Sequence, residues 1–127
     1  MTRLAQYTTL GLGGAATVLE ASSQADVVAL AREYPQARIL GGGSNVVAAD
    51  AGVAEPVIRL TATGQVRHDD QVIVTAGTPW DDFVAQMVAE GRSGIESLSG
   101  IPGSVGATPI QNVGAYGQEV AETIAGM

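Results

Sequence analysis

The sequence predicts a mixed α/β (α+β) fold, and three patterns along its 127 residues support this prediction. Residues 15–40 have the pattern of a strand, a helix and a second strand. Residues 57–75 have the pattern of a strand followed by a hairpin, and residues 78–91 have that of an amphipathic helix. The length is that of one ordinary domain, which is sufficient to bury a hydrophobic core.

The first pattern is a β-α-β unit. Ala15–Glu20 is rich in apolar and β-branched residues, as strands are. Ser23 stands three residues before Asp26, which is typical of a helix N-cap, and apolar residues then recur at helical spacing until Pro35 interrupts them. Arg38–Leu40 is the second predicted strand, and a run of glycines follows it directly.

The second part of the chain predicts a hairpin followed by a helix. Val57–Leu60 is a strand, and Gln65–His68 and Val72–Thr75 are expected to pair through a turn at Asp69-Asp70. Thr78-Pro79 is expected to open a helix, with Thr78 as the capping hydroxyl. The helix is expected to end at Gly91 and to pack against the hairpin through an apolar stripe made of Trp80, Phe83, Val84, Met87 and Val88.

Composition excludes several classes of protein. The chain has 13 acidic and 6 basic side chains, a net charge of −7, no Cys and a single His. The acidic balance disfavours nucleic acid as a partner, and the absence of Cys excludes disulfides, thiolate zinc sites and cysteine nucleophiles. Neither a secretory signal nor a membrane-spanning segment is visible, so we expect a soluble cytoplasmic protein without a metal site.

Several motifs do not qualify as sites. Residues 11–16 match the G-x-G-x-x-A dinucleotide fingerprint, but they precede a predicted strand instead of following one. A P-loop is excluded because the chain has no Lys. Asp69-Asp70 is better explained as a hairpin tip, Asp81-Asp82 as a helix N-terminus, and His68 as a strand-face residue.

One glycine run predicts an anion site. It follows a strand and consists of Gly41, Gly42, Gly43, Ser44 and Asn45. Consecutive backbone N–H groups without bulky side chains form an anion nest, which suits a pyrophosphate and needs no Lys. The alternative is a plain turn after a strand.

A second glycine-rich segment covers residues 100–117 and contains five glycines and two prolines. Glycines let the backbone approach a flat ring, and prolines hold its path rigid. Thr108, Gln111 and Asn112 can hydrogen-bond the edge of a heteroaromatic ring. Such a long uncharged segment predicts a large and mostly apolar cofactor with few polar anchors.

Three segments match one family in order, spacing and content: TTLGLGG at 8–14, LGGGSNVV at 40–47, and GIPGSVG with PIQNVGAYG within 100–117. They resemble the MurB family, the UDP-N-acetylenolpyruvoylglucosamine reductases (UDP-N-acetylmuramate dehydrogenases). The resemblance covers essentially the whole chain. It implies a PCMH-type, vanillyl-alcohol-oxidase-like FAD-binding fold, with a small α/β subdomain at residues 1–56, the start of a second subdomain at 57–127, and no substrate-binding domain.

The resemblance also implies a cofactor site. FAD is expected to bind without a covalent link, with its pyrophosphate on Gly41–Asn45. The residues implied to line the path from adenine to isoalloxazine are Ile101, Pro102, Gly103, Val105, Gly106, Thr108, Ile110, Gln111, Asn112, Gly114, Ala115 and Tyr116.

In the family, NADPH reduces the flavin, which then reduces the enolpyruvyl group of a UDP-sugar in peptidoglycan synthesis. The family's catalytic Arg, Ser and Glu lie beyond the Gly-Ala-Tyr-Gly motif, so we expect no catalytic residue here and an FAD-binding part that is inactive alone. Arg92 and Ser93 stand in the wrong motif to replace them. Two alternatives stay open: an FAD-linked alcohol or sugar oxidase of the same fold, and a non-catalytic remnant or nucleotide-binding module.

Overall fold

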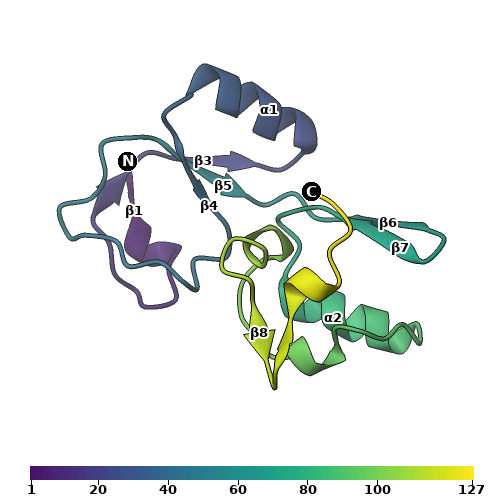
Figure 1. Ribbon diagram of the computed structural model, residues 1–127. Coiled ribbons are helices and arrows are strands. Elements are labelled where there is room, and N and C mark those ends of the chain that lie inside the picture. Colours follow the sequence, from purple (N-terminus) through teal and green to yellow (C-terminus); the bar gives the residue numbers. More distant parts are fainter. The chain divides into compact units, whose positions relative to one another are not determined.

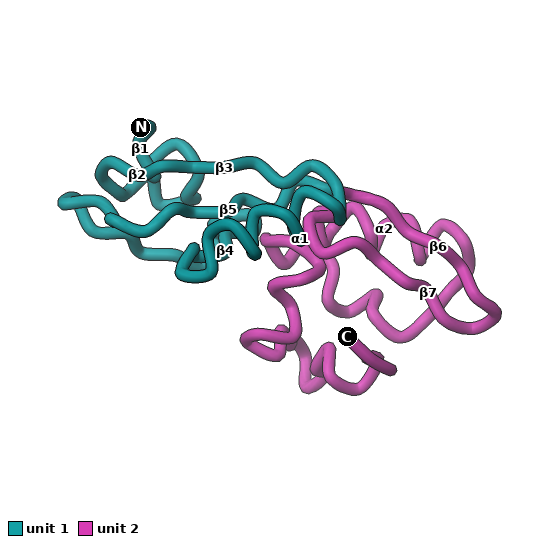
Figure 2. Tube along the Cα trace, turned by 90° about the horizontal axis from the view of Figure 1, so that it is seen from above, with its two compact units in different colours: residues 1–62 teal, residues 63–127 magenta.

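The computed structural model describes all 127 residues, which form two compact units, residues 1–62 and 63–127 (Figure 2). The division follows Ala62, whereas the family resemblance predicts a boundary between residues 56 and 57. The reason is the strand Val57–Leu60, which forms parallel ladders with two strands of the first unit and so belongs to it.

The first unit is built on a three-stranded parallel sheet in the order β3-β5-β4 (Figure 1). The strands are β3 (Val18–Ala21), β4 (Arg38–Leu40) and β5 (Val57–Leu60). The helix α1 (Gln24–Glu33) joins β3 to β4 and contacts β3 and β5. The predicted β-α-β unit is therefore confirmed, and β5 lies between its two strands.

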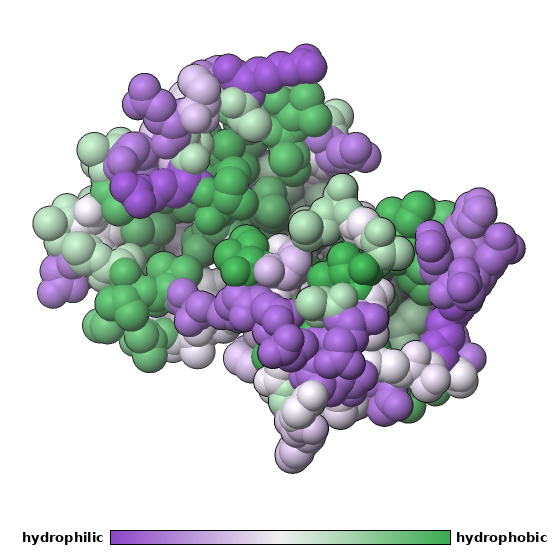
Figure 3. All heavy atoms as spheres, in the orientation of Figure 1, coloured by the Kyte–Doolittle hydropathy of each residue, from purple (hydrophilic) through white to green (hydrophobic).

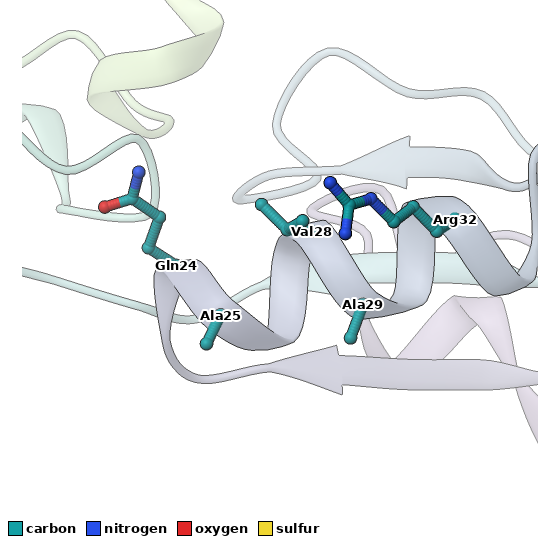
Figure 4. Close-up of a pocket in the computed structure, with 5 residues that line it drawn as sticks. All are labelled: Gln24, Ala25, Val28, Ala29 and Arg32. Carbon is teal, nitrogen blue, oxygen red and sulfur yellow. The ribbon is translucent and has the colours of Figure 1, made fainter.

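The helix α1 begins as its sequence predicts. The hydroxyl of Ser23 accepts the backbone N–H of Asp26 at 3.1 Å, and the carboxylate of Asp26 accepts the backbone N–H of Ser22 at 3.0 Å. These hydrogen bonds and that from the Ser22 hydroxyl lower the pKa of Asp26, the side-chain bond from Ser22 being the largest cause. The outer surface of α1 has an open hollow lined by Gln24, Ala25, Val28, Ala29 and Arg32 (Figure 4), which holds no nucleophile or acid–base pair.

The predicted strand at residues 15–20 is split into two. β2 (Ala15–Ala16) pairs antiparallel with β1 (Thr2–Arg3), and β3 begins only at Val18. A 3-10 turn, η1 (Leu4–Gln6), follows β1. The core of this unit is formed by Leu4, Ala16, Leu40 and Val57.

The second unit begins with a hairpin, as predicted. β6 (Gln65–His68) pairs antiparallel with β7 (Gln71–Val74), and Asp69 makes the turn with φ of 54°. α2 (Trp80–Ala89) follows, and Gly91 ends it in the left-handed region at φ of 73°. Arg67 of β6 hydrogen-bonds to Glu90 just after α2 and so ties the hairpin to the helix.

Two details of α2 differ from the expectation. Pro79 is the N-cap residue and the hydroxyl of Thr78 caps nothing, because it accepts the backbone N–H of Gly64 at 3.1 Å. The core around α2 is built with the following loop and not with the hairpin. Its buried members are Trp80, Val84, Leu98, Val113 and Val120.

The remainder of the second unit is mostly irregular, as its glycine content predicts. Short 3-10 turns lie at η2 (Glu96–Leu98), η3 (Val105–Ala107) and η4 (Val120–Glu122). The strands β8 (Gly114–Ala115) and β9 (Gln118–Glu119) form a small hairpin. None of the helices is both long and apolar enough to span a membrane.

Candidate functional site

The loop Gly41–Asn45 lies at the carboxyl end of β4 in the first unit. All three strands of this sheet are parallel, so their carboxyl ends meet at one edge, where open α/β sheets bind ligands. Gly42 and Asn45 are exposed, Gly41 and Ser44 are half-buried, and Gly43 is buried. The loop is therefore accessible from solvent, except at Gly43, which packs against the rest of the unit.

The backbone N–H groups of the first four residues of this loop have no partner in the chain. No acceptor within the chain receives the N–H groups of Gly41, Gly42, Gly43 or Ser44. Four successive unpaired N–H groups, with a left-handed residue among them, have the character of an anion-binding nest. This observation favours the anion site over a plain turn, and it shows that the residues present fit a diphosphate group.

Gly43 is a glycine because of the chain's own packing. Its φ is 71°, and a Cβ at this position would lie 1.9 Å from the carbonyl oxygen of Tyr7. The carbonyl of Gly43 accepts the backbone N–H of Thr9 at 3.0 Å. The segment Tyr7–Thr9 thus supports the loop from behind and fixes its shape.

A cationic side chain that the sequence analysis did not single out lies close to this support. Arg59 of β5 is paired in register with Leu40, the residue before the glycine loop. Its guanidinium carbon lies 5.2 Å from the centre of the Tyr7 ring, and its Nη1 donates to Glu20 at 2.8 Å. The sequence does not show that Arg59 lies next to the glycine loop, because this depends on how β4 and β5 are paired.

The second glycine-rich segment is hydrogen-bonded to the start of α2. The carbonyl of Gly103 accepts the backbone N–H of Trp80 at 2.9 Å, and the N–H of Val105 donates to Thr78 at 2.8 Å. The N–H of Gly106 donates to the carbonyl of Ala76 at 2.9 Å, and a Cβ on Gly106 would lie 2.6 Å from the Cβ of Ala76. Gly106 therefore permits close contact within the protein itself.

The polar residues of this segment already have partners inside the chain. The hydroxyl of Thr108, which is 5% exposed, donates to the carbonyl of Val105 at 2.8 Å. The side chain of Asn112 donates to Glu119 at 2.7 Å and accepts the N–H of Ala121 at 3.1 Å. Hydrogen bonding of these residues to a heteroaromatic edge remains a prediction.

The rest of the segment is more open. Ile110 is 85% exposed and Tyr116 is 95% exposed, with Tyr116 in the left-handed region at φ of 56°. Gln111 and Gly114 are exposed as well. Pro102 is also exposed. The half-buried residues of the segment are Ile101, Gly103, Val105, Gly106 and Ala115. Exposed apolar side chains, and non-glycine residues such as Tyr116 at a left-handed φ, are both found in ligand-contacting loops. Hydrophobic side chains also reach the surface of the first unit, as the green spheres in Figure 3 illustrate, and Leu10 and Val47 are among its exposed apolar residues.

Acidic side chains accept backbone hydrogen bonds at the start of this segment and just before it. Asp81, expected only at a helix N-terminus, accepts the backbone N–H of Gly100 at 2.6 Å and the hydroxyl of Ser99 at 3.3 Å. Backbone N–H groups of Glu96 itself and of Gly94 lower the pKa of the Glu96 carboxyl. His68 and Asp69 lie 3.6 Å apart at the exposed hairpin tip, and no group of side chains could hold a metal ion.

Comparisons with known proteins show which proteins the chain is similar to. The chain is 50% identical over 131 residues to the UDP-N-acetylenolpyruvoylglucosamine reductase of Thermobifida fusca, which covers 95% of this chain and 37% of the relative. It is 54% identical over 134 residues to that of Salinispora arenicola, covering 98% of this chain and 37% of the relative. The chain thus spans little more than a third of the length of these curated relatives.

The chain is also similar to a solved structure of a reductase with the same name. The crystal structure of UDP-N-acetylenolpyruvylglucosamine reductase (MurB) from Thermus caldophilus matches with a TM-score of 0.79 and 34% identity, covering 94% of this chain and 44% of that one. The FAD binding domain family matches residues 15–127, which is most of the chain. The expected α+β FAD-binding fold is therefore confirmed, and the chain belongs to the FAD binding domain family.

Proposed function

We propose that this chain is the FAD-binding portion of an NADPH-dependent reductase that converts UDP-N-acetylglucosamine enolpyruvate into UDP-N-acetylmuramate for peptidoglycan synthesis. The relatives at about 50% identity carry the name of this reductase, which supports the proposal. NADPH and the UDP-sugar are then the co-substrates, and the cytoplasm is the compartment. No residue of the 127 is assigned to a catalytic step.

The single observation that carries cofactor binding is the row of unpaired N–H groups at Gly41–Ser44, at the carboxyl edge of a parallel sheet. These donors would bind the diphosphate of FAD through backbone dipoles. In the second unit, the exposed Ile110 and Tyr116 would pack against the rings, and Gly103 and Gly114 would let the backbone approach them. When bound, FAD supplies two-electron redox chemistry.

The first experiment asks whether the chain holds flavin. The purified protein should absorb at ~450 nm, the region typical of bound flavin, and should take up added FAD in a fluorescence titration. Gly42→Val should weaken FAD binding, because a branched side chain would cover the exposed N–H groups of the loop. Gly126→Val is the matched control, since a Cβ at Gly126 meets nothing within 4 Å.

Three outcomes separate the alternatives. A colourless protein that ignores FAD supports the non-catalytic remnant and overturns the proposal. For a protein that binds FAD, the gene product of the whole locus should oxidise NADPH only when UDP-N-acetylglucosamine enolpyruvate is added. Consumption of O2 with an alcohol or a sugar, and none with the UDP-sugar, would support the oxidase instead.

A further inference from the structure

We propose that Arg59 is a binding residue for the cofactor diphosphate and supplies the positive charge that the Gly41–Ser44 amides lack. This inference rests on the proposed function, and it adds to the site a residue outside both glycine-rich segments. A diphosphate carries negative charge into a protein whose own net charge is −7. Backbone dipoles contribute only partial charges, so a full cation at the same sheet edge strengthens binding.

The sheet register places Arg59 next to the loop. Glu20, Arg59 and Leu40 form one row across β3, β5 and β4, one residue before the carboxyl end of β5. Leu40 is followed directly by Gly41. The neighbouring cation Arg38 lies in the row of Val57, at the opposite end of the same sheet, where it pairs with Glu55 at 2.8 Å.

Tyr7 connects the guanidinium to the loop. The guanidinium carbon of Arg59 lies 5.2 Å from the centre of the Tyr7 ring. The carbonyl oxygen of the same Tyr7 lies 1.9 Å from where a Cβ of Gly43 would be. Tyr7 therefore contacts the cation through its ring and the buried glycine of the loop through its backbone carbonyl.

The guanidinium has donors to spare. It has five N–H groups, of which only one, on Nη1, has an acceptor in the chain, the carboxylate of Glu20 at 2.8 Å. The side chain of Arg59 is 37% exposed and that of Glu20 is 55% exposed, so both are accessible. The ring of Tyr7 and the carboxylate of Glu20 hold the guanidinium in place, which lowers the entropy lost when a diphosphate binds.

The purely structural alternative treats Arg59 and Glu20 as a surface ion pair, and the two readings predict opposite results for the partner. If Arg59 has the proposed role, Arg59→Gln raises the Kd for FAD roughly tenfold, because one charge-assisted hydrogen bond is lost. Glu20→Gln removes a nearby negative charge and frees the guanidinium, so it lowers the Kd about two- to threefold. As a structural pair alone, the two variants would behave alike.

The measurement is an FAD titration of the whole chain at low and high salt, with far-UV circular dichroism to confirm folding. Arg38→Gln is the matched control and should leave the Kd within about twofold of the unaltered chain, because Arg38 is paired with Glu55 at the end of the sheet away from the loop. Arg59→Gln should also show a weaker dependence of Kd on salt. Arg59→Lys keeps the charge without the planar fork and should give an intermediate Kd.

The outcomes distinguish this inference from the function on which it rests. If the unaltered chain binds FAD and Arg59→Gln matches Arg38→Gln, the role of Arg59 is overturned while FAD binding stands. The same conclusion follows if Arg59→Gln and Glu20→Gln raise the Kd equally. If Arg59→Gln does not fold, the Kd values of Arg59→Lys and Glu20→Gln test the role instead. If both variants bind FAD with the same Kd as the unaltered chain, the role of Arg59 is refuted. If the unaltered chain does not bind FAD, the proposed function fails first and the inference fails with it.

Discussion

Replacing Gly43 by Ala adds a methyl group where the chain has no room for one. The new Cβ would lie 1.9 Å from the carbonyl oxygen of Tyr7 and 3.1 Å from the Cα of Thr8, and both are backbone atoms that cannot rotate away. The residue must also keep a φ of 71°. The substitution therefore strains the loop and the segment behind it at once.

The expected cost has two parts. A left-handed conformation costs a non-glycine residue about 1–2 kcal/mol. Overpacking typically adds about 1–3 kcal/mol when backbone has to shift. The free energy of unfolding of the first unit should therefore fall by about 2–5 kcal/mol. Gly11→Ala isolates the first part, because Gly11 has a φ of 65° and nothing within 4 Å of its Cβ position.

The assay is urea denaturation followed by far-UV circular dichroism, for Gly43→Ala, Gly11→Ala and the unaltered chain. The difference between the two variants measures the overlap with Tyr7 alone. We expect Gly43→Ala to be less stable than Gly11→Ala by at least ~1 kcal/mol. Equal stabilities would refute the close contact on which the shape of the loop depends.

Three further predictions concern the second unit. Trp80→Ala should lower the free energy of unfolding by about 3–5 kcal/mol in a urea titration, because Trp80 is 2% exposed in the core, and a cost below ~1 kcal/mol would contradict that packing. Asp81→Asn should lower the free energy of unfolding by about 0.5–1.5 kcal/mol, because it weakens the hydrogen bonds that Asp81 accepts from Ser99 and Gly100. Asp82→Asn, in the same helix turn, is the control and should be nearly neutral. Similar values for the two variants would show that only the interaction with the helix dipole matters. The hydrogen bond from Arg67 is the first cause of the lowered pKa of Glu90, whose ordinary value is 4.5. Folding therefore favours the ionised carboxyl, so this stabilisation is complete above pH ~4.5 and is lost as the pH falls through the lower folded value. Unfolding monitored from pH 7 to 2 should show a smaller acid-side loss in Arg67→Gln than in the unaltered chain, and an identical loss would exclude this pair.

Much of the fold follows from local signals in the sequence. The helix α1 and the strand β4 begin and end close to where Ser23, Pro35 and the glycines predict, because capping and chain breaking are properties of a few neighbouring residues. The position of β5 between β3 and β4 is not local, and it moved the unit boundary to Ala62. Thr78 has the residue type of a helix cap, but its hydroxyl accepts the backbone N–H of Gly64 instead.

The candidate site was visible in part. Glycine runs mark backbone that turns or approaches another group, and the N–H groups of Gly41–Ser44 are unpaired, as an anion nest requires. The sequence does not say what the approaching atoms are, and for Gly106 they belong to Ala76 of the same chain. Arg59 was missed because its place beside the loop depends on the strand register and on Tyr7, neither of which has a local signature.

The most direct test of the nest is an NMR titration of the 15N-labelled chain with FAD, read at the amides of Gly41, Gly42, Gly43 and Ser44. A backbone N–H that gains a phosphate acceptor shifts strongly downfield. We therefore expect these four signals to move together and to saturate with the same Kd as the flavin fluorescence. Saturation of the fluorescence with these four amides unmoved would show that the diphosphate lies elsewhere.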